Sequence, residues 1–221
     1  MRAVIFDLDG TLVDTVYAHT FAWWKVLAEA RLPVPSWKVH RLIGMSGGLI
    51  TKAAGHEIGR DLSDDEVERL QTRHGEVYKS LLPDRTPLPG ALDLLRHLRQ
   101  ANIKHAIATS GKHKDAAASL DVLDLPAGTV IVDRTAVERA KPEPDLFLAC
   151  QEKLGVSPAE CYVVGDAVWD LLAARRAGML GIGLLSGGYG EEELARAGAY
   201  RVYHDPAELL SHIYQLGLRS S

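Results

Sequence analysis

The chain has 221 residues and a hydrophobic content of 47%, which is enough for one well-formed core or for a core with a small second domain. Its formal net charge of −4 lacks the basic excess that nucleic-acid-binding proteins usually carry. Two cysteines cannot form a disulfide framework, and no apolar run approaches the ~18 residues of a membrane span. We therefore expect a cytoplasmic chain that binds neither nucleic acid nor membrane.

The first predicted element is a strand over residues 3–6, a continuous apolar run of the kind that is buried on both faces of a parallel sheet. Asp7 and Asp9 follow it, and Gly10 permits a tight turn. In open α/β sheets, ligands bind beyond the carboxyl ends of the strands, so both carboxylates are candidates for catalysis. One can act as an ionised nucleophile, while the other exchanges protons with the leaving group and with water.

This Asp-x-Asp-Gly pattern is not unique to catalytic sites. It also occurs in ordinary turns and in calcium-binding loops. A calcium loop needs further oxygen ligands at regular spacing and a closing Glu, whereas Thr11 is followed here by Leu-Val-Asp-Thr.

The next part of the chain, up to about residue 82, has a helical pattern without a convincing strand. Helices are predicted over residues 17–30, 37–43, 48–57 and 64–81. Ser63 and Glu66 form a capping-box pattern at the start of the last helix. Trp23 and Trp24 are expected in the apolar core of these helices.

A segment rich in proline and turn residues follows over residues 82–90 and is typical of a linker. It divides the chain into two predicted parts. We expect residues 1–15 and 86–221 to form a core domain, with residues 16–85 inserted into it as a small α-helical domain.

After the linker, strands alternate with helices, which is the pattern of a parallel α/β sheet. Further strands are predicted over residues 104–109, 129–132, 161–164 and 180–184. Helices are predicted over residues 89–100, 144–154 and 171–177. The predicted fold class is therefore α/β, a Rossmann-like parallel sheet flanked by helices, with the helical domain inserted after its first strand.

Two further acids lie at one of these strand ends. Asp166 follows the apolar run over residues 161–164, and Asp170 lies one helical turn further along. Asp170 is also a common type of residue at the start of a helix, where the macrodipole favours an acid. Four acids at one edge of a sheet repel each other, and a hard divalent cation such as Mg²⁺ relieves that repulsion.

Two hydroxyl groups and a lysine complete the set of candidates. Thr109 and Ser110 end a strand where a phosphate can bind at a helix N-terminus, although these residue types also commonly cap helices. Lys141 is held in an extended segment by the prolines that follow it. Its ammonium can bind a phosphoryl oxygen and offset the acids, although an isolated Lys-Pro pair is more often a solvated surface feature.

In this order, the four motifs resemble those of the haloacid dehalogenase superfamily of aspartate-nucleophile phosphohydrolases, along nearly the whole chain. The resemblance implies that Asp7 is the nucleophile that forms an aspartyl-phosphate and that Asp9 is the general acid and base. It also implies a Mg²⁺ site formed by Asp7, the main-chain carbonyl of Asp9, and Asp166, with Asp170 as a supporting acid. The helical insert resembles the cap that closes over the site in this family and selects the substrate.

The resemblance implies a phosphate-binding set as well. Lys141 matches the lysine that stabilises the phosphate. Thr109, with the neighbouring Ser110, matches the phosphate-binding hydroxyls, and backbone amides such as that of Gly10 are expected to support them.

Several reactions occur in this superfamily, and Asp9 separates some of them. Its dehalogenases lack this second acid and need no metal, and phosphonate-cleaving members usually lack it too. His19 is similar to a histidine of the beta-phosphoglucomutase type, but Gly47 stands where that enzyme has an arginine that anchors the distal phosphate. Both His19 and Arg41 are candidates for substrate contact; the alternative is an ordinary surface or hinge histidine for His19 and a solvated surface position for Arg41.

We therefore predict a Mg²⁺-dependent phosphatase of small phosphorylated metabolites, similar to phosphoglycolate phosphatases, that exists as a monomer or a weak homodimer. A sugar phosphomutase is the alternative. A catalytically silent member that binds a metabolite or a protein partner is disfavoured, because Asp7, Asp9 and Asp166 are all present.

Overall fold

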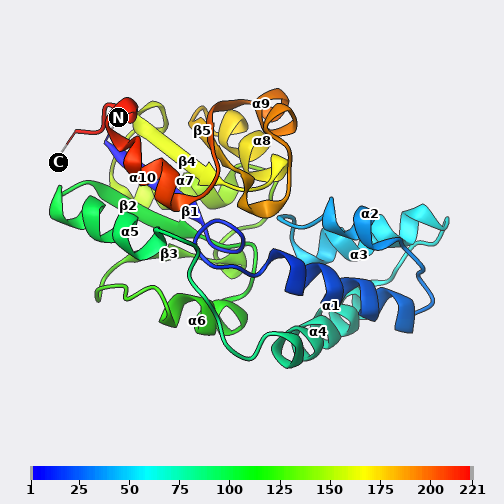
Figure 1. Cartoon of the computed structure of the whole chain (residues 1–221). Coiled ribbons are helices and arrows are strands. Elements are labelled where there is room, and N and C mark those ends of the chain that lie inside the picture. The colour runs from blue at the N-terminus through cyan, green and yellow to red at the C-terminus, as the bar shows by residue number, and fades with distance from the viewer. Residues whose placement is uncertain (1, 220–221) are drawn as a thin grey trace.

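One parallel sheet lies at the centre of the computed structural model, which describes residues 2–219 and leaves Met1 and Ser220–Ser221 outside the described part of the chain (Figure 1). Its six strands have the order β3-β2-β1-β4-β5-β6, and every neighbouring pair is parallel. The strands are β1 (Ala3–Asp7), β2 (Lys104–Ala108), β3 (Val130–Val132), β4 (Cys161–Gly165), β5 (Leu180–Leu184) and β6 (Ala199–Tyr203). The predicted α/β fold is confirmed.

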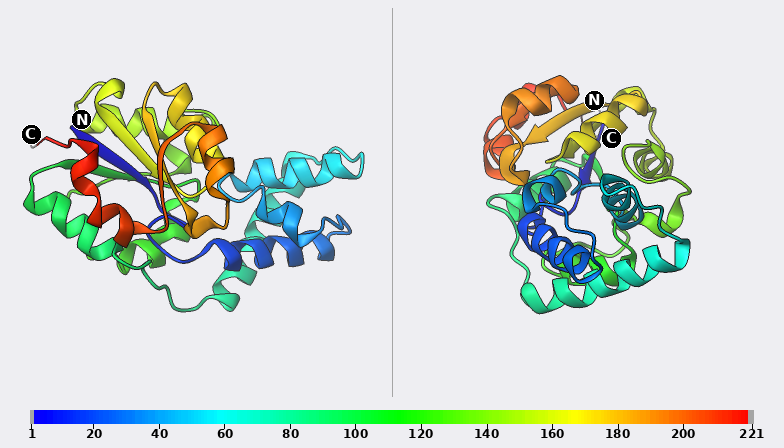
Figure 2. Two further views of the ribbon diagram at one scale, coloured as in Figure 1. Left: turned by 45° about the horizontal axis from the view of Figure 1, so that its top comes forward. Right: turned by 90° about the vertical axis from the view of Figure 1, so that its right-hand side faces the viewer.

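Helices cover both faces of this sheet (Figure 2). They are α5 (Ala91–Gln100), α6 (His113–Asp121), α7 (Asp145–Leu154), α8 (Val168–Arg176), α9 (Glu191–Ala197) and α10 (Pro206–Ser211). Val4 and Phe6 of β1 pack into one apolar cluster with residues of α5, α6 and α10. Ala3 and Ile5 point to the opposite face and pack with residues of α7 and α8. Burial on both faces explains why the strand is a continuous apolar run.

Four helices follow β1 in the chain and extend from one end of the sheet (Figures 1 and 2). They are α1 (Val16–Glu29), α2 (Ser36–His40), α3 (Gly47–Glu57) and α4 (Asp64–Leu81). Their apolar side chains form a cluster of their own, which includes Trp23 at 3% exposure. Trp24 is 46% exposed, so the prediction that it belongs to this core is wrong. Successive residues on a helix point about 100° apart, and Trp24 therefore faces solvent when Trp23 faces the core.

The capping box at the start of α4 is confirmed. The hydroxyl of Ser63 accepts a hydrogen bond from the backbone N–H of Glu66, and the Glu66 carboxylate accepts one from the backbone N–H of Ser63. Cys150 and Cys161 are both free and buried. None of the helices among the described residues combines the length and the apolar character that a bilayer span requires.

Several short elements were not predicted. β6 pairs only with β5, at the edge of the sheet, and its Tyr200 and Arg201 are exposed, so it lacks the apolar run of the central strands. Helices α9 and α10 were not predicted, and the helix expected after Thr109 and Ser110, for which no bounds were predicted, is α6. Helix α8 begins at Val168, three residues before the predicted start at position 171, which brings Asp170 into its first turn.

Candidate active site

The carboxyl ends of β1 and β4 bring three acids together. The two strands pair in parallel, with Phe6 beside Val164, so Asp7 at the end of β1 lies close to Asp166, which follows β4. Asp170 reaches the same place from the first turn of α8. Carboxylate oxygens of Asp7, Asp166 and Asp170 lie within 4.8 Å of one another, and all three residues are buried.

Lys141 pairs with two of these acids. Its side chain is fully buried, and Nζ lies 2.6 Å from Asp7 Oδ1 and 2.7 Å from Asp170 Oδ1. One ammonium does not neutralise three buried carboxylates. Burial raises the pKa of Asp7 to about 7 against the attraction of Lys141, and the charge of Asp170 adds to the rise. Burial, with repulsion from Asp170 and Asp7, also raises the pKa of Asp166 well above its usual value.

Two carboxylate oxygens indicate where a cation fits. Asp166 Oδ1 accepts a hydrogen bond from Thr11 Oγ1 at 2.8 Å, while Oδ2 of Asp166 and Oδ2 of Asp7 have no hydrogen-bond partner among residues 2–219. The backbone passes close to this point, because a Cβ at Gly187 would lie only 2.0 Å from Asp166 Oδ2. Mg²⁺ prefers carboxylate oxygens together with water and phosphate oxygens, so this donor set fits it.

Asp170 has a different set of partners. Its Oδ1 accepts from Lys141, and its Oδ2 accepts from the backbone N–H of Ala167 at 3.1 Å. With both oxygens engaged, this geometry favours a role in holding the lysine over direct contact with a metal.

The Asp9 carboxylate lies outside the acid cluster and contacts α1 and the segment before it. Thr15 Oγ1 donates to Asp9 Oδ1 at 2.8 Å, and His19 Nε2 lies 3.5 Å from the same oxygen. Burial alone would raise the pKa of Asp9, but hydrogen bonds and charge attraction from His19 and the Thr15 hydroxyl outweigh burial and lower it. The Asp9 side chain is 25% exposed, against 5% for Asp7, so it is the more accessible acid for a leaving group or water.

The two predicted phosphate-binding hydroxyls lie at the end of β2, the strand beside β1. Thr109 is buried near Asp7, and its Oγ1 accepts a hydrogen bond from the backbone N–H of Gly111 at 3.1 Å. Ser110 Oγ donates instead to the carbonyl oxygen of Gly44 at 3.1 Å. The Ser110 hydroxyl therefore links the sheet to the helical insert in this conformation.

A comparison with known families agrees with this arrangement. A family model for haloacid dehalogenase-like hydrolases matches residues 1–178. The chain belongs to this family. The resemblance that the four motifs suggested is thereby confirmed.

Relatives of this haloacid dehalogenase-like hydrolase carry more than one functional name. The chain is 33% identical to a beta-phosphoglucomutase of Bacillus subtilis (strain 168), over 85% of this chain and 84% of the relative. It is 35% identical to a phosphoglycolate phosphatase of Rhodospirillum rubrum, over 94% of this chain and 89% of the relative. The crystal structure of a hydrolase from Pseudomonas syringae matches with a TM-score of 0.94 at 46% identity and covers 100% of both chains.

Arg41 of the hydrolase lies where the helical insert meets the sheet. Its Nη2 lies 3.1 Å from Glu193 Oε1 of α9, and its guanidinium lies 4.6 Å from the ring of Tyr189. The Arg41 carbonyl oxygen accepts hydrogen bonds from Trp169 Nε1 at 2.9 Å and from the Tyr189 hydroxyl at 3.0 Å. Trp169 and Tyr189 were not among the predicted site residues, although Trp169 lies inside the motif that carries two of the acids. Contact between Arg41 and a substrate stays a prediction.

Two residues of α4 that the sequence analysis did not single out contact His19. His74 Nε2 lies 3.2 Å from His19 Nδ1, and the ring of Tyr78 stacks on the His19 ring with centroids 3.8 Å apart. His74 and Tyr78 lie one helical turn apart and so share a face of α4. Nothing in the sequence links that face to His19.

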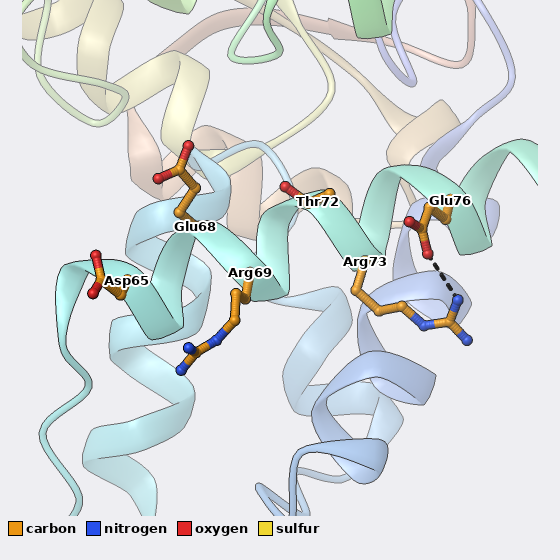
Figure 3. A pocket seen from close by; sticks show the side chains of 6 residues that line it. All are labelled: Asp65, Glu68, Arg69, Thr72, Arg73 and Glu76. Atoms are coloured by element: carbon orange, nitrogen blue, oxygen red, sulfur yellow. Dashed lines mark hydrogen bonds and ion pairs between the residues drawn. The ribbon is translucent and has the colours of Figure 1, made fainter.

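The outer surface of α4 carries a shallow hollow of about 470 Å³ (Figure 3). It is lined by Asp65, Glu68, Arg69, Thr72, Arg73 and Glu76. None of these side chains belongs to the acid cluster, and Arg73 forms ion pairs with Glu76 and with Glu29 of α1. We assign this hollow no part in the hydrolase reaction.

Proposed function

We propose that this hydrolase is a Mg²⁺-dependent phosphatase of small phosphorylated metabolites that acts through an aspartyl-phosphate on Asp7. The observation that carries the proposal is the contact of a fully buried Lys141 with Asp7 Oδ1, beside oxygens of Asp7 and Asp166 that lack partners among the described residues. This arrangement combines a carboxylate nucleophile, a cation for phosphoryl oxygens and a place for a metal.

Each residue has a defined part in the proposed reaction. Lys141 and Thr109 hold phosphoryl oxygens, and Asp7 attacks phosphorus in line while the bond to the leaving oxygen breaks. Asp9 gives a proton to that leaving oxygen and later takes one from the water that hydrolyses the aspartyl-phosphate. Mg²⁺, held by Asp7, Asp166 and the Asp9 carbonyl, would neutralise charge on the transferring group.

We further propose that residues 16–85 act as a cap over this site. Their separate apolar cluster supports this, as do the Ser110–Gly44 contact and the Trp169–Arg41 contact, because these join the insert to the sheet near the acids. Such a cap would exclude bulk water and strengthen the electrostatic interactions inside.

We favour a phosphatase over a phosphomutase because of the packing around Gly47. A Cβ at this position would lie 2.9 Å from the ring of Trp23 and 3.0 Å from Gln71, so a larger side chain needs both to move. Gly47 itself also supplies no cation for a distal phosphate, where the mutase has an arginine. The phosphoglycolate phosphatase relative makes phosphoglycolate the first substrate to test, and the beta-phosphoglucomutase relative keeps a sugar phosphomutase as the second candidate.

One assay series tests the proposal. Phosphate release should be measured from an aryl phosphate and from phosphoglycolate with Mg²⁺, with EDTA, and with Asp7→Asn. We expect release only from the unmodified chain with Mg²⁺, because the nucleophile and the metal are both required. Activity that persists in EDTA or in Asp7→Asn contradicts the mechanism. Isomerisation of beta-glucose 1-phosphate with a bisphosphate primer, without net phosphate release, would favour the mutase.

A further inference from the structure

The side chain of His19 is held at both ring nitrogens. Its Nε2 lies 3.5 Å from Asp9 Oδ1, and its Nδ1 lies 3.2 Å from Nε2 of His74. His19 comes from α1 and His74 from α4, so two helices of the insert meet beside Asp9. An imidazole that is fixed at one nitrogen presents the other nitrogen in a defined direction.

The same ring is also held from its face. Tyr78 stacks on His19 with centroids 3.8 Å apart and an interplanar angle of 10°. The Arg85 guanidinium lies 4.3 Å from the centroid of the Tyr78 ring. Since His19 already covers one face of that ring at so short a distance, Arg85 must lie on the other. The His19 ring therefore packs on Tyr78 of α4, and Tyr78 in turn packs on Arg85 of the linker after α4.

His74 is itself held in place. Its ring stacks on Trp23 with centroids 4.1 Å apart, and Trp23 is buried in the apolar cluster of the insert. Burial lowers the pKa of His74 well below its usual value, so the ring is neutral and has one donor and one acceptor nitrogen. The hydrogen bond to His19 uses one of these nitrogens and depends on the ring orientation that Trp23 imposes.

His19 contacts the Asp9 carboxylate at a single oxygen. Thr15 Oγ1 and His19 Nε2 both contact Asp9 Oδ1, and Asp9 Oδ2 has no partner among the described residues. With Oδ1 fixed from two sides, Oδ2 is the oxygen that remains for proton exchange with a substrate.

We propose that His74 is a positioning residue for Asp9: by holding Nδ1 of His19, it keeps His19 Nε2 on Asp9 Oδ1 and so orients Asp9 Oδ2 toward the leaving oxygen of the substrate. The inference rests on the proposed function, in which Asp9 is the general acid and base. His74 touches neither substrate nor metal in this scheme. Its contribution is the orientation of a side chain that does.

The reaction step gives this role a specific signature. As the bond between phosphorus and the leaving oxygen breaks, a proton moves from Asp9 Oδ2 to that oxygen, while the new bond forms to Asp7. A basic alkoxide needs this proton, whereas the anion of an acidic phenol leaves almost as well without it. Loss of the Asp9 orientation should therefore slow the hydrolysis of alkyl phosphates far more than that of nitrophenyl phosphate.

The experiment compares kcat/KM for nitrophenyl phosphate, phenyl phosphate and an alkyl phosphate such as phosphoglycolate. His74→Phe keeps a ring against Trp23 but removes both nitrogens, and His74→Gln keeps a side chain that can hydrogen-bond. The matched control is His56→Phe, which replaces an exposed histidine of α3 in the same insert. Thermal unfolding of each variant is recorded alongside.

We expect His74→Phe to lose about tenfold or more on the alkyl phosphate and less than about threefold on nitrophenyl phosphate. His74→Gln should recover much of the loss, and His56→Phe should match the unmodified chain on all three esters. Equal losses on every ester in both His74 variants, or no loss in His74→Phe, would overturn the positioning role. If the unmodified chain hydrolyses none of the esters, the proposed function itself fails, which is a different result.

Discussion

Asp166 and Asp170 lie one helical turn apart, yet their carboxylates have different partners. Asp166 keeps one oxygen free of hydrogen bonds among the described residues, whereas Asp170 uses both, for Lys141 and for the backbone N–H of Ala167. A buried lysine is stable only with close partners, and Asp170 supplies one of the two that the structure gives it. The two acids should therefore contribute to different properties of the site.

This difference gives a prediction for a matched pair of variants. Asp166→Asn should weaken Mg²⁺ binding by about tenfold or more, because a neutral amide is a poorer ligand than a carboxylate. Asp170→Asn should leave Mg²⁺ affinity within about threefold but reduce kcat at saturating Mg²⁺, because Lys141 loses a charged partner. Calorimetric titration with Mg²⁺ and steady-state kinetics separate the two effects. If both variants weaken Mg²⁺ binding equally, Asp170 is itself a direct ligand.

At the scale of single elements, α4 combines a capped N-terminus with the residues that hold His19. Its first turn is fixed by the reciprocal hydrogen bonds of Ser63 and Glu66. His74 and Tyr78 lie near its other end. The hydrogen bonds at the N-terminus should therefore affect the stability of α4 without touching the chemistry directly.

Replacement of the N-cap tests this separation. Ser63→Ala should lower the free energy of unfolding by about 1 kcal/mol, because one backbone N–H of α4 loses its acceptor. The activity of the folded enzyme should stay unchanged. Urea unfolding curves measure the loss, and Ser63→Asp is the control because Asp is also a good N-cap. A loss in Ser63→Asp as large as in Ser63→Ala would show that the N-cap hydrogen bond is not the cause.

The same elements show what the sequence can and cannot predict. β1 and β4 were predictable because strands buried on both faces are continuous apolar runs, and acids at their ends indicate the site. β6 was not, because an edge strand with exposed Tyr200 and Arg201 has no such run. The role suggested for His74 depends on its packing against Trp23 and His19, which come from another helix. The spacing of residues in the sequence does not predict a contact between two helices.

At the scale of the whole molecule, the core contains more buried negative than positive charge around one point. Burial raises the pKa of Asp7 from 3.8 to about 7, against the attraction of Lys141, and raises that of Asp166 in the same direction. Between these two pKa values the unfolded chain has released the Asp7 proton while the folded chain still holds it, so folding takes up a proton and becomes less favourable as the pH rises. Between about pH 4 and 7, stability from Asp7 is therefore greatest at the acidic end and falls as the pH rises. Asp9 behaves in the opposite way, because its pKa is lowered in the folded chain. It stabilises the fold at pH values above the pKa of the unfolded chain, and this contribution is lost as the pH falls.

Mg²⁺ should reverse the trend that Asp7 and Asp166 create. The metal binds the deprotonated carboxylates and competes with their protons, so it stabilises the fold more strongly as the pH rises. We expect the melting temperature in EDTA to fall between about pH 5 and about pH 8, and the increase caused by Mg²⁺ to be larger at the higher pH. Thermal unfolding with and without Mg²⁺ across this range measures both. In Asp7→Asn, which removes one titrating acid, the fall in EDTA should be shallower. An increase from Mg²⁺ of the same size at both ends of the range would mean that the metal does not bind these buried acids.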